Sequence, residues 1–104
     1  MNVEEVKELV RSAIKNANIK GDIETAVETA EKRVESAFKS KNMKIRKVDR
    51  FCVETKSETI CQTTFITGDF VILVTVGVDY ESKKGRISSD VLSLMEYFEM
   101  MTRR

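Results

Sequence analysis

The longest run of apolar, β-branched residues in the chain spans residues 69–80 and reads Asp-Phe-Val-Ile-Leu-Val-Thr-Val-Gly-Val-Asp-Tyr. Val, Ile and Phe are enriched in β-strands, and the run follows a glycine, Gly68, that is suited to a turn. It is shorter than the roughly 20 apolar residues that a membrane-spanning helix requires. The run therefore predicts the central β-strand of the fold, which the rest of the chain must cover or pair with.

Two amphipathic helices are predicted ahead of the strands. Apolar residues recur every three or four positions in residues 3–18 and again in residues 23–40, so each segment has one apolar helical side. Between them, Gly21 can adopt the left-handed conformation at a helix end, and Asp22 can cap the free N–H groups of the second helix. The expected arrangement is a helical hairpin.

Two further strand-like runs occupy residues 43–54 and 59–67, and short turns connect them to each other and to residues 70–80. Two-residue loops at residues 56–57 and 68–69 would place Cys52 opposite Cys61, and would pair Val53 with Ile60 in the same hairpin. In the second hairpin, the same rule pairs Ile66 with Val71 and Thr64 with Leu73. Strands joined in this way form an antiparallel meander.

A last helix is expected to begin after Ser88 or Ser89, following a basic loop at residues 82–86, and to include Val91, Leu94 and Phe98. The predicted fold is α+β: an N-terminal helical hairpin, a three-stranded antiparallel meander and a C-terminal helix, in the order ααβββα. With 104 residues, the chain is expected to form a single domain over residues 1–104.

The two faces of the predicted sheet have different compositions. One is the expected floor for all three helices and carries Val48, Cys52, Cys61, Phe65, Phe70, Ile72, Val74, Val76, Val78 and Tyr80. The other face is also unusually apolar, and its large side chains are Ile45, Phe51, Val53, Ile60, Ile66, Val71 and Leu73. A monomer seldom exposes so many apolar side chains together, so these seven residues are predicted to form a homodimer or other protein interface. The alternatives are a helix lying behind the sheet or a β-bulge that shifts the register.

In the predicted three-stranded meander, residues 69–80 lie at one edge of the sheet. The backbone N–H and C=O groups on the outer side of this strand are therefore unpaired. A second subunit could then add a strand there.

The composition excludes several chemistries. Histidine is absent, which removes Ser-His-Asp and Cys-His nucleophile systems and His-ligated zinc. No arrangement of side chains in the sequence converges on a catalytic site, and two cysteines cannot complete a four-ligand metal site. We therefore expect no enzymatic activity, no cofactor and no metal.

Cys52 and Cys61 support two interpretations. The N-terminus lacks a secretory signal, so a cytoplasmic location is expected, and in that compartment the two cysteines are predicted to be free thiols that act as small buried hydrophobes. A cross-strand thiol pair with a redox function is the alternative.

The net charge of +1 gives no argument for a membrane or nucleic-acid partner by bulk attraction, but positive charge is concentrated locally. Residues 36–50 contain six basic side chains and one acidic one. The basic residues are Lys39, Lys41, Lys44, Arg46, Lys47 and Arg50. They are the best candidates for nucleic-acid contact.

The sequence thus favours a small, non-enzymatic protein-interaction module that forms a homodimer through its sheet, with no membrane partner. A nucleic-acid-binding module using residues 39–50 is the alternative, and a redox function of the two cysteines is a third.

Overall fold

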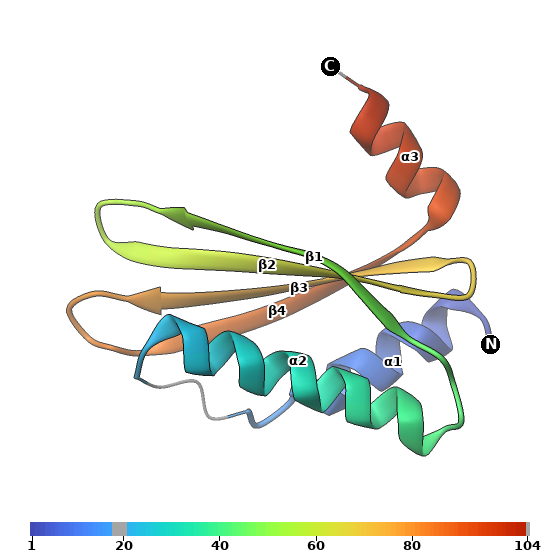
Figure 1. Cartoon of the computed structure of the whole chain (residues 1–104), viewed down its shortest axis with the longest axis horizontal. Helices are drawn as coiled ribbons and strands as arrows, with labels where there is room; N and C mark the ends of the chain where they lie inside the picture. The colour runs from blue at the N-terminus through green and yellow to red at the C-terminus, as the bar shows by residue number, and fades with distance from the viewer. Residues whose placement is uncertain (18–20, 104) are drawn as a thin grey trace.

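The computed structural model describes residues 1–17 and 21–103. Within these residues the chain forms three helices and a four-stranded antiparallel sheet, in the order ααββββα (Figure 1). The predicted α+β class is confirmed. The predicted number of strands is wrong, because the segment expected to be a basic loop and the start of a helix forms a fourth strand.

The first two helices follow the predicted pattern closely. α1 (Val3–Ile14) begins with a capping box, in which the Asn2 side chain accepts a hydrogen bond from the Glu5 N–H at 2.9 Å. α1 ends earlier than residue 18, since Asn16 has a left-handed backbone with a φ of 63°. α2 (Ile23–Ser40) has the predicted bounds and is capped by Asp22, which accepts from the Thr25 N–H at 2.8 Å. The expected turn includes residues 18–20, which lie outside the described residues.

The first three strands are β1 (Arg46–Glu54), β2 (Glu58–Thr67) and β3 (Phe70–Asp79). The predicted register is confirmed in both hairpins: Cys52 pairs with Cys61 and Val53 with Ile60, whereas Ile66 pairs with Val71 and Thr64 with Leu73. Gly68 has a φ of 55°, as the tight turn between β2 and β3 requires.

The fourth strand, β4 (Gly85–Ser93), pairs along the whole length of β3, from Phe70 opposite Ser93 to Val78 opposite Gly85. The turn before it is held by the Asp79 side chain, which accepts hydrogen bonds from the N–H groups of Glu81 and Ser82 at 3.0 and 2.9 Å. Because β4 occupies the outer side of β3, the idea that a second subunit adds there is wrong. The edges of the sheet are β1 and β4.

One hydrophobic cluster joins the sheet to α1 and α2, which lie together on one face (Figure 1). α1 contacts β4, and α2 contacts β2 and β3. The predicted core face is largely confirmed by Phe65, Ile72, Val74, Val76, Val78 and Cys61, all of which are buried. Val48, Cys52 and Tyr80 are exceptions that remain exposed, because Val48 and Cys52 lie on the edge strand β1, Val48 at a bulge, and Tyr80 follows the end of β3.

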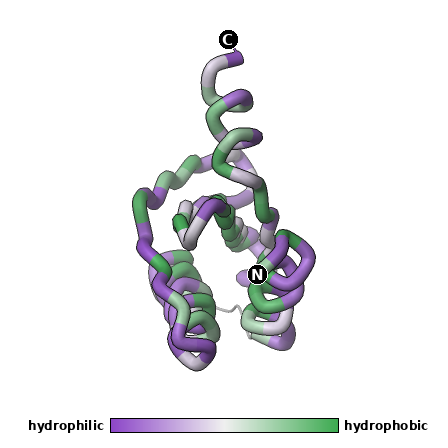
Figure 2. Tube along the Cα trace, turned by 90° about the vertical axis from the view of Figure 1, so that its right-hand side faces the viewer, coloured by the Kyte–Doolittle hydropathy of each residue, from purple (hydrophilic) through white to green (hydrophobic). Residues whose placement is uncertain are grey.

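The prediction that all three helices share this face is wrong. α3 (Leu94–Thr102) begins at Ser93, where β4 ends, and lies on the other side of the sheet, pointing away from it (Figure 1). Figure 2 gives the same arrangement from the side, with hydrophobic positions along α3 and no other helix near it. None of the helices in the described part of the chain is long and apolar enough to cross a membrane.

Candidate interaction surface

The face of the sheet opposite α1 and α2, called the open face below, has an exposed apolar area over β1 and β2. Phe51 is 64% exposed and Val53 is 46% exposed, while Ile60 and Ile66 are half-buried. Phe51 lies across from Gln62 and Val53 across from Ile60, so these side chains share one face of the hairpin. Four of the seven predicted interface residues are therefore accessible.

The other three predicted interface residues do not belong to this exposed area. Val71 is fully buried and Leu73 is 9% exposed, in a sheet where β4 flanks β3 and was missing from the prediction. Ile45 precedes β1 and is half-buried, because it packs against the hydrophobic cluster under the sheet.

α3 adds an apolar surface that sequence reasoning did not assign to the interface. Met95 is 71% exposed, Phe98 58%, Met100 50% and Met101 49%. No residue of α3 is buried. Together with Phe51 and Val53 of the open face, these side chains account for six of the exposed large apolar residues in the described part of the chain.

The start of α3 is nevertheless well defined. Ser93 and Glu96 form a capping box, in which the Ser93 hydroxyl accepts from the Glu96 N–H and the Glu96 carboxylate accepts from the Ser93 N–H, both at 3.0 Å. These hydrogen bonds hold the pKa of Glu96 below its ordinary value. The Leu94 N–H also donates to the Asp69 carbonyl at 2.9 Å, which ties the first turn to the sheet. The direction of α3 is thus set at its first turn.

Charge on the open face is paired at its centre and unpaired at its edges. Arg86 of β4 forms an ion pair with Glu58 of β2 at 2.8 Å, across Gly77 of β3. The middle of the face carries Gln62, whose amide donates to the Thr75 hydroxyl at 3.4 Å. Arg46 and Asp49 of β1 and Asp90 of β4 lie on the same face without an ion pair among the described residues, and all three are on edge strands, where the polar rim of an interface would leave them in water.

The predicted basic stretch is divided between two faces of the molecule. Lys47 and Arg50 bind Glu31 of α2, with Lys47 Nζ 3.2 Å from Oε1 and Arg50 Nε 2.9 Å from Oε2. Three residues apart in a regular strand, their side chains would point to opposite faces. A bulge between Lys47 and Asp49 adds a residue at Val48, and both cations thereby reach α2.

The remaining basic residues of the stretch are exposed. Lys39, Lys44 and Arg46 line a shallow hollow with Met43, Ile45 and Ile66 at the end of the sheet, and Lys41 caps α2. The basic loop at Lys83 and Lys84 lies at the opposite end, as the register requires. Nucleic-acid binding by Lys39, Lys41, Lys44 and Arg46 stays a prediction, which a binding titration at low salt can test.

Glu31 is the one buried charged side chain in the described part of the chain, at 3% exposure. Burial alone raises the pKa of Glu31, but hydrogen bonds from Arg50, Thr63 and Lys47 outweigh burial and place the pKa below its ordinary value of 4.5. The Thr63 hydroxyl donates to Oε2 at 2.7 Å, so both carboxylate oxygens are satisfied. This network fastens the edge strand β1 to α2.

The lowered pKa of Glu31 predicts a specific acid sensitivity. A group whose pKa is depressed by folding stabilises the protein above its unfolded pKa, and this contribution is lost as pH falls through the folded pKa. The stability advantage of the native chain over Glu31→Gln should therefore be full at neutral pH and shrink below about pH 4.5. Urea unfolding of both proteins at several pH values measures this difference. A constant difference across the acid range would contradict the assignment, since Asp22, Asp79 and Glu96 are shared by both proteins.

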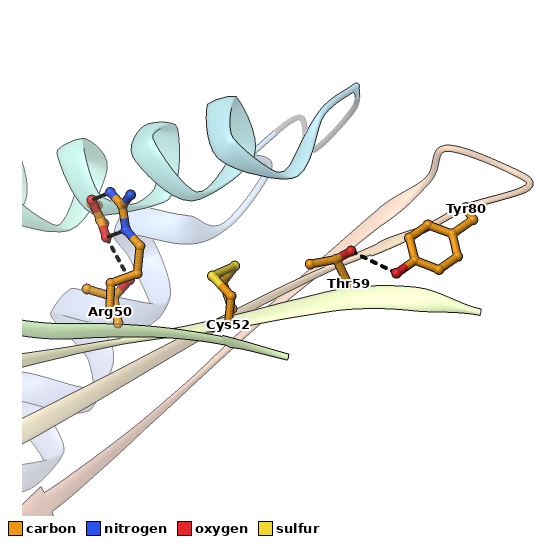
Figure 3. Close-up of a disulfide and its surroundings, with 7 residues drawn as sticks. Arg50, Cys52, Thr59 and Tyr80 are labelled. Atoms are coloured by element: carbon orange, nitrogen blue, oxygen red, sulfur yellow. Dashed lines mark hydrogen bonds and ion pairs between the residues drawn. A yellow bond between two sulfur atoms is a disulfide. The ribbon is translucent and has the colours of Figure 1, made fainter. Parts of the chain in front are cut away.

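The prediction of free thiols is wrong, because Cys52 and Cys61 form a disulfide between β1 and β2 (Figure 3). The residues are directly opposite each other and their Cα atoms are 4.1 Å apart, the close spacing of a non-hydrogen-bonded pair. Cys61 is buried and Cys52 is exposed. The bridge also bears on the expected cytoplasmic location, since disulfides persist mainly in oxidising compartments and in proteins of hyperthermophiles.

No group of histidine, cysteine, aspartate or glutamate side chains in the described residues is arranged to hold a metal ion. Comparison with known proteins found no matching family model, no matching curated protein and no matching solved structure. The function therefore has to be argued from the geometry of the chain itself.

Proposed function

We propose that the protein is a non-enzymatic interaction module that self-associates through the open face of its sheet. The observation that carries this proposal is the exposure of large apolar side chains on two surfaces on the same side of the sheet, the open face over β1 and the helix α3. A monomer seldom leaves so many large apolar side chains exposed on one side, and such surfaces mark interaction sites. Here Phe51, Val53, Met95, Phe98 and Met101 are each about half exposed or more.

The charge distribution fits an apolar contact with a polar rim. Arg86 is paired with Glu58, Lys47 and Arg50 are turned to the other side toward Glu31, and the unpaired Arg46 lies on the edge strand β1. Aromatic and Met side chains are the types enriched at the centres of protein interfaces. The absence of histidine supports a binding role over a catalytic one.

Substitution of the open face tests the proposal. Phe51→Lys should raise the dimer dissociation constant roughly tenfold or more, because a buried lysine without a partner costs more than about 1.4 kcal/mol. Light scattering coupled to size-exclusion chromatography at tens of micromolar measures the shift. Val71 is unsuitable for this purpose, since it is fully buried and lysine there would disturb the fold.

Tyr80→Lys provides the matched control. Tyr80 is 40% exposed and lies at the other end of the sheet from α3, where its backbone N–H bonds to Ser57. The control should dimerise as the native chain does. If Phe51→Lys and Tyr80→Lys behave alike, self-association through the open face is wrong.

A further inference from the structure

We propose that the dimer forms by reciprocal exchange of α3, with α3 of each subunit packed on the open face of a second copy of the chain. This inference rests on the self-association proposed above and names the contact that mediates it. Three observations lead to it: the lack of support for α3 within its own subunit, the apolar stripe that α3 carries, and the matching area on the open face.

Beyond its first turn, α3 has little support from its own subunit. It has nine residues, fewer than the roughly 12–15 that an isolated helix needs for even marginal stability in water. Helices of this length are normally held by packing of an apolar side, yet in α3 only Leu94 and Tyr97 reach the half-buried class. The contacts of α3 within the chain are with β3 and β4, close to its first turn.

The exposed side of α3 is suited to packing on another surface. Leu94, Phe98 and Met101 follow the i, i+4, i+7 spacing of one helical side, and Met95 lies beside them. Glu96, Glu99, Met100 and Arg103 line a hollow that α3 forms with Leu92 of its own β4. Met100 is therefore on the largely polar side of the helix that borders its own sheet, while Met95 and Phe98 on the other side are left to solvent.

The available area fits a second copy of the chain. A large aromatic side chain buries about 150–250 Å², and with this figure as an upper value for each, the five side chains of Phe51, Val53, Met95, Phe98 and Met101 present on the order of 600 Å² per subunit. Reciprocal contact would bury on the order of 1,200 Å² in total, the lower end of the range for specific, stable complexes. A foreign peptide would cover one of the two surfaces and leave the other exposed.

Reciprocal exchange of α3 also limits the assembly to a closed dimer. Each subunit offers one helix and one open face, and a two-fold axis pairs each helix with the other subunit's face. The apolar side of each α3 and the open face of each subunit are then both covered, so neither of these surfaces is left for a third subunit. The occupant of the open face is thus α3 of a second copy.

Mixing two full-length variants tests the exchange directly. Phe98→Lys damages the helix and Phe51→Lys damages the face, so each variant alone has a defect in both contacts of its dimer and should bind itself roughly tenfold or more weakly. In a mixed dimer, α3 of the Phe51→Lys subunit meets the face of the Phe98→Lys subunit, and neither of these surfaces is altered. The second contact carries both substitutions and is lost, but a contact that one lysine already breaks loses little more from a second, so the mixed dimer keeps one intact contact where each variant alone has none. Size-exclusion light scattering of the equimolar mixture should show dimer at concentrations where either variant alone is monomeric.

The outcomes separate the exchange from self-association in general. If Phe98→Lys dimerises like the native chain while Phe51→Lys does not, the exchange is wrong and association through the sheet stands. If both variants are weakened and the mixture stays monomeric, the two surfaces do not meet each other, and the exchange is again wrong. A monomeric native chain overturns both proposals. Both positions are more than half exposed, and circular dichroism of each variant confirms that it is folded.

Discussion

Arg50→Ala is expected to lower the free energy of unfolding by about 3 kcal/mol, because it removes the bidentate partner of the buried Glu31 carboxylate. Removing one member of a buried ion pair leaves an uncompensated charge and costs roughly 3–5 kcal/mol. The lower end applies here, since about a third of the Arg50 side chain is exposed and Lys47 and Thr63 still contact the carboxylate. Urea unfolding followed by circular dichroism measures the change.

Arg46→Ala is the matched control, because Arg46 is an arginine of the same strand, and no ion pair is present for it among the described residues. It should change stability by less than about 0.5 kcal/mol. A second comparison uses Glu31→Gln as the background, where no buried charge is left unpaired. There Arg50→Ala should cost only about 1 kcal/mol, and an equal cost in both backgrounds would show that the ion pair is not the source of the effect.

Loss of the disulfide is expected to lower the free energy of unfolding by about 2.5 kcal/mol. The bridge joins residues nine positions apart, and closing a loop of that length removes about this much conformational entropy from the unfolded chain. Cys52→Ala is the preferred variant, because Cys52 is exposed and its removal creates no cavity, whereas Cys61 is buried in the core.

Reduction provides the control for this variant. Native protein in excess dithiothreitol should have the same stability as Cys52→Ala within about 0.5 kcal/mol, since both lack only the bridge. If Cys52→Ala is as stable as the oxidised native protein, then the bridge does not contribute to stability. Self-association would make the measured stability depend on protein concentration, so both proteins are compared at one concentration. The expected effect of losing the disulfide then does not depend on dimer formation.

The helices, the first three strands and their register follow from local sequence patterns. The helical spacing of apolar residues and the capping residue Asp22 define the start of α2. Gly68 defines the turn that sets the register of β2 and β3. Once the two-residue loop at residues 56–57 is known, the pairing of Cys52 with Cys61 follows from strand geometry. The oxidised state of the pair does not follow from geometry, which is why free thiols were predicted.

β4 was missed because its sequence resembles the start of a helix. Ile87 and Val91 lie four residues apart, Val91 continues into the apolar spacing of Leu94 and Phe98, and two serines at positions 88 and 89 suggest a cap. The decisive signal lay later in the chain. Ser93 with Glu96 forms a capping box, which marks the true start of α3, and the residues before it were free to form a strand.

The remaining features depend on tertiary structure and could not be predicted from local patterns. The network of Glu31, Lys47 and Arg50 requires both a bulge in β1 and the placement of α2 beneath it. The burial of Val71 requires β4, and the exposure of Phe98 requires α3 to lie on the other side of the sheet. Sequence analysis therefore predicted an interface on the open face but did not predict that α3 lies on the same side of the sheet.

The molar mass of the native chain in solution tests the central claim most directly. Sedimentation equilibrium over a range of concentrations should give twice the 11.9 kDa of one chain at tens of micromolar, and a lower average mass on dilution. A mass of 11.9 kDa throughout that range would contradict self-association through the open face.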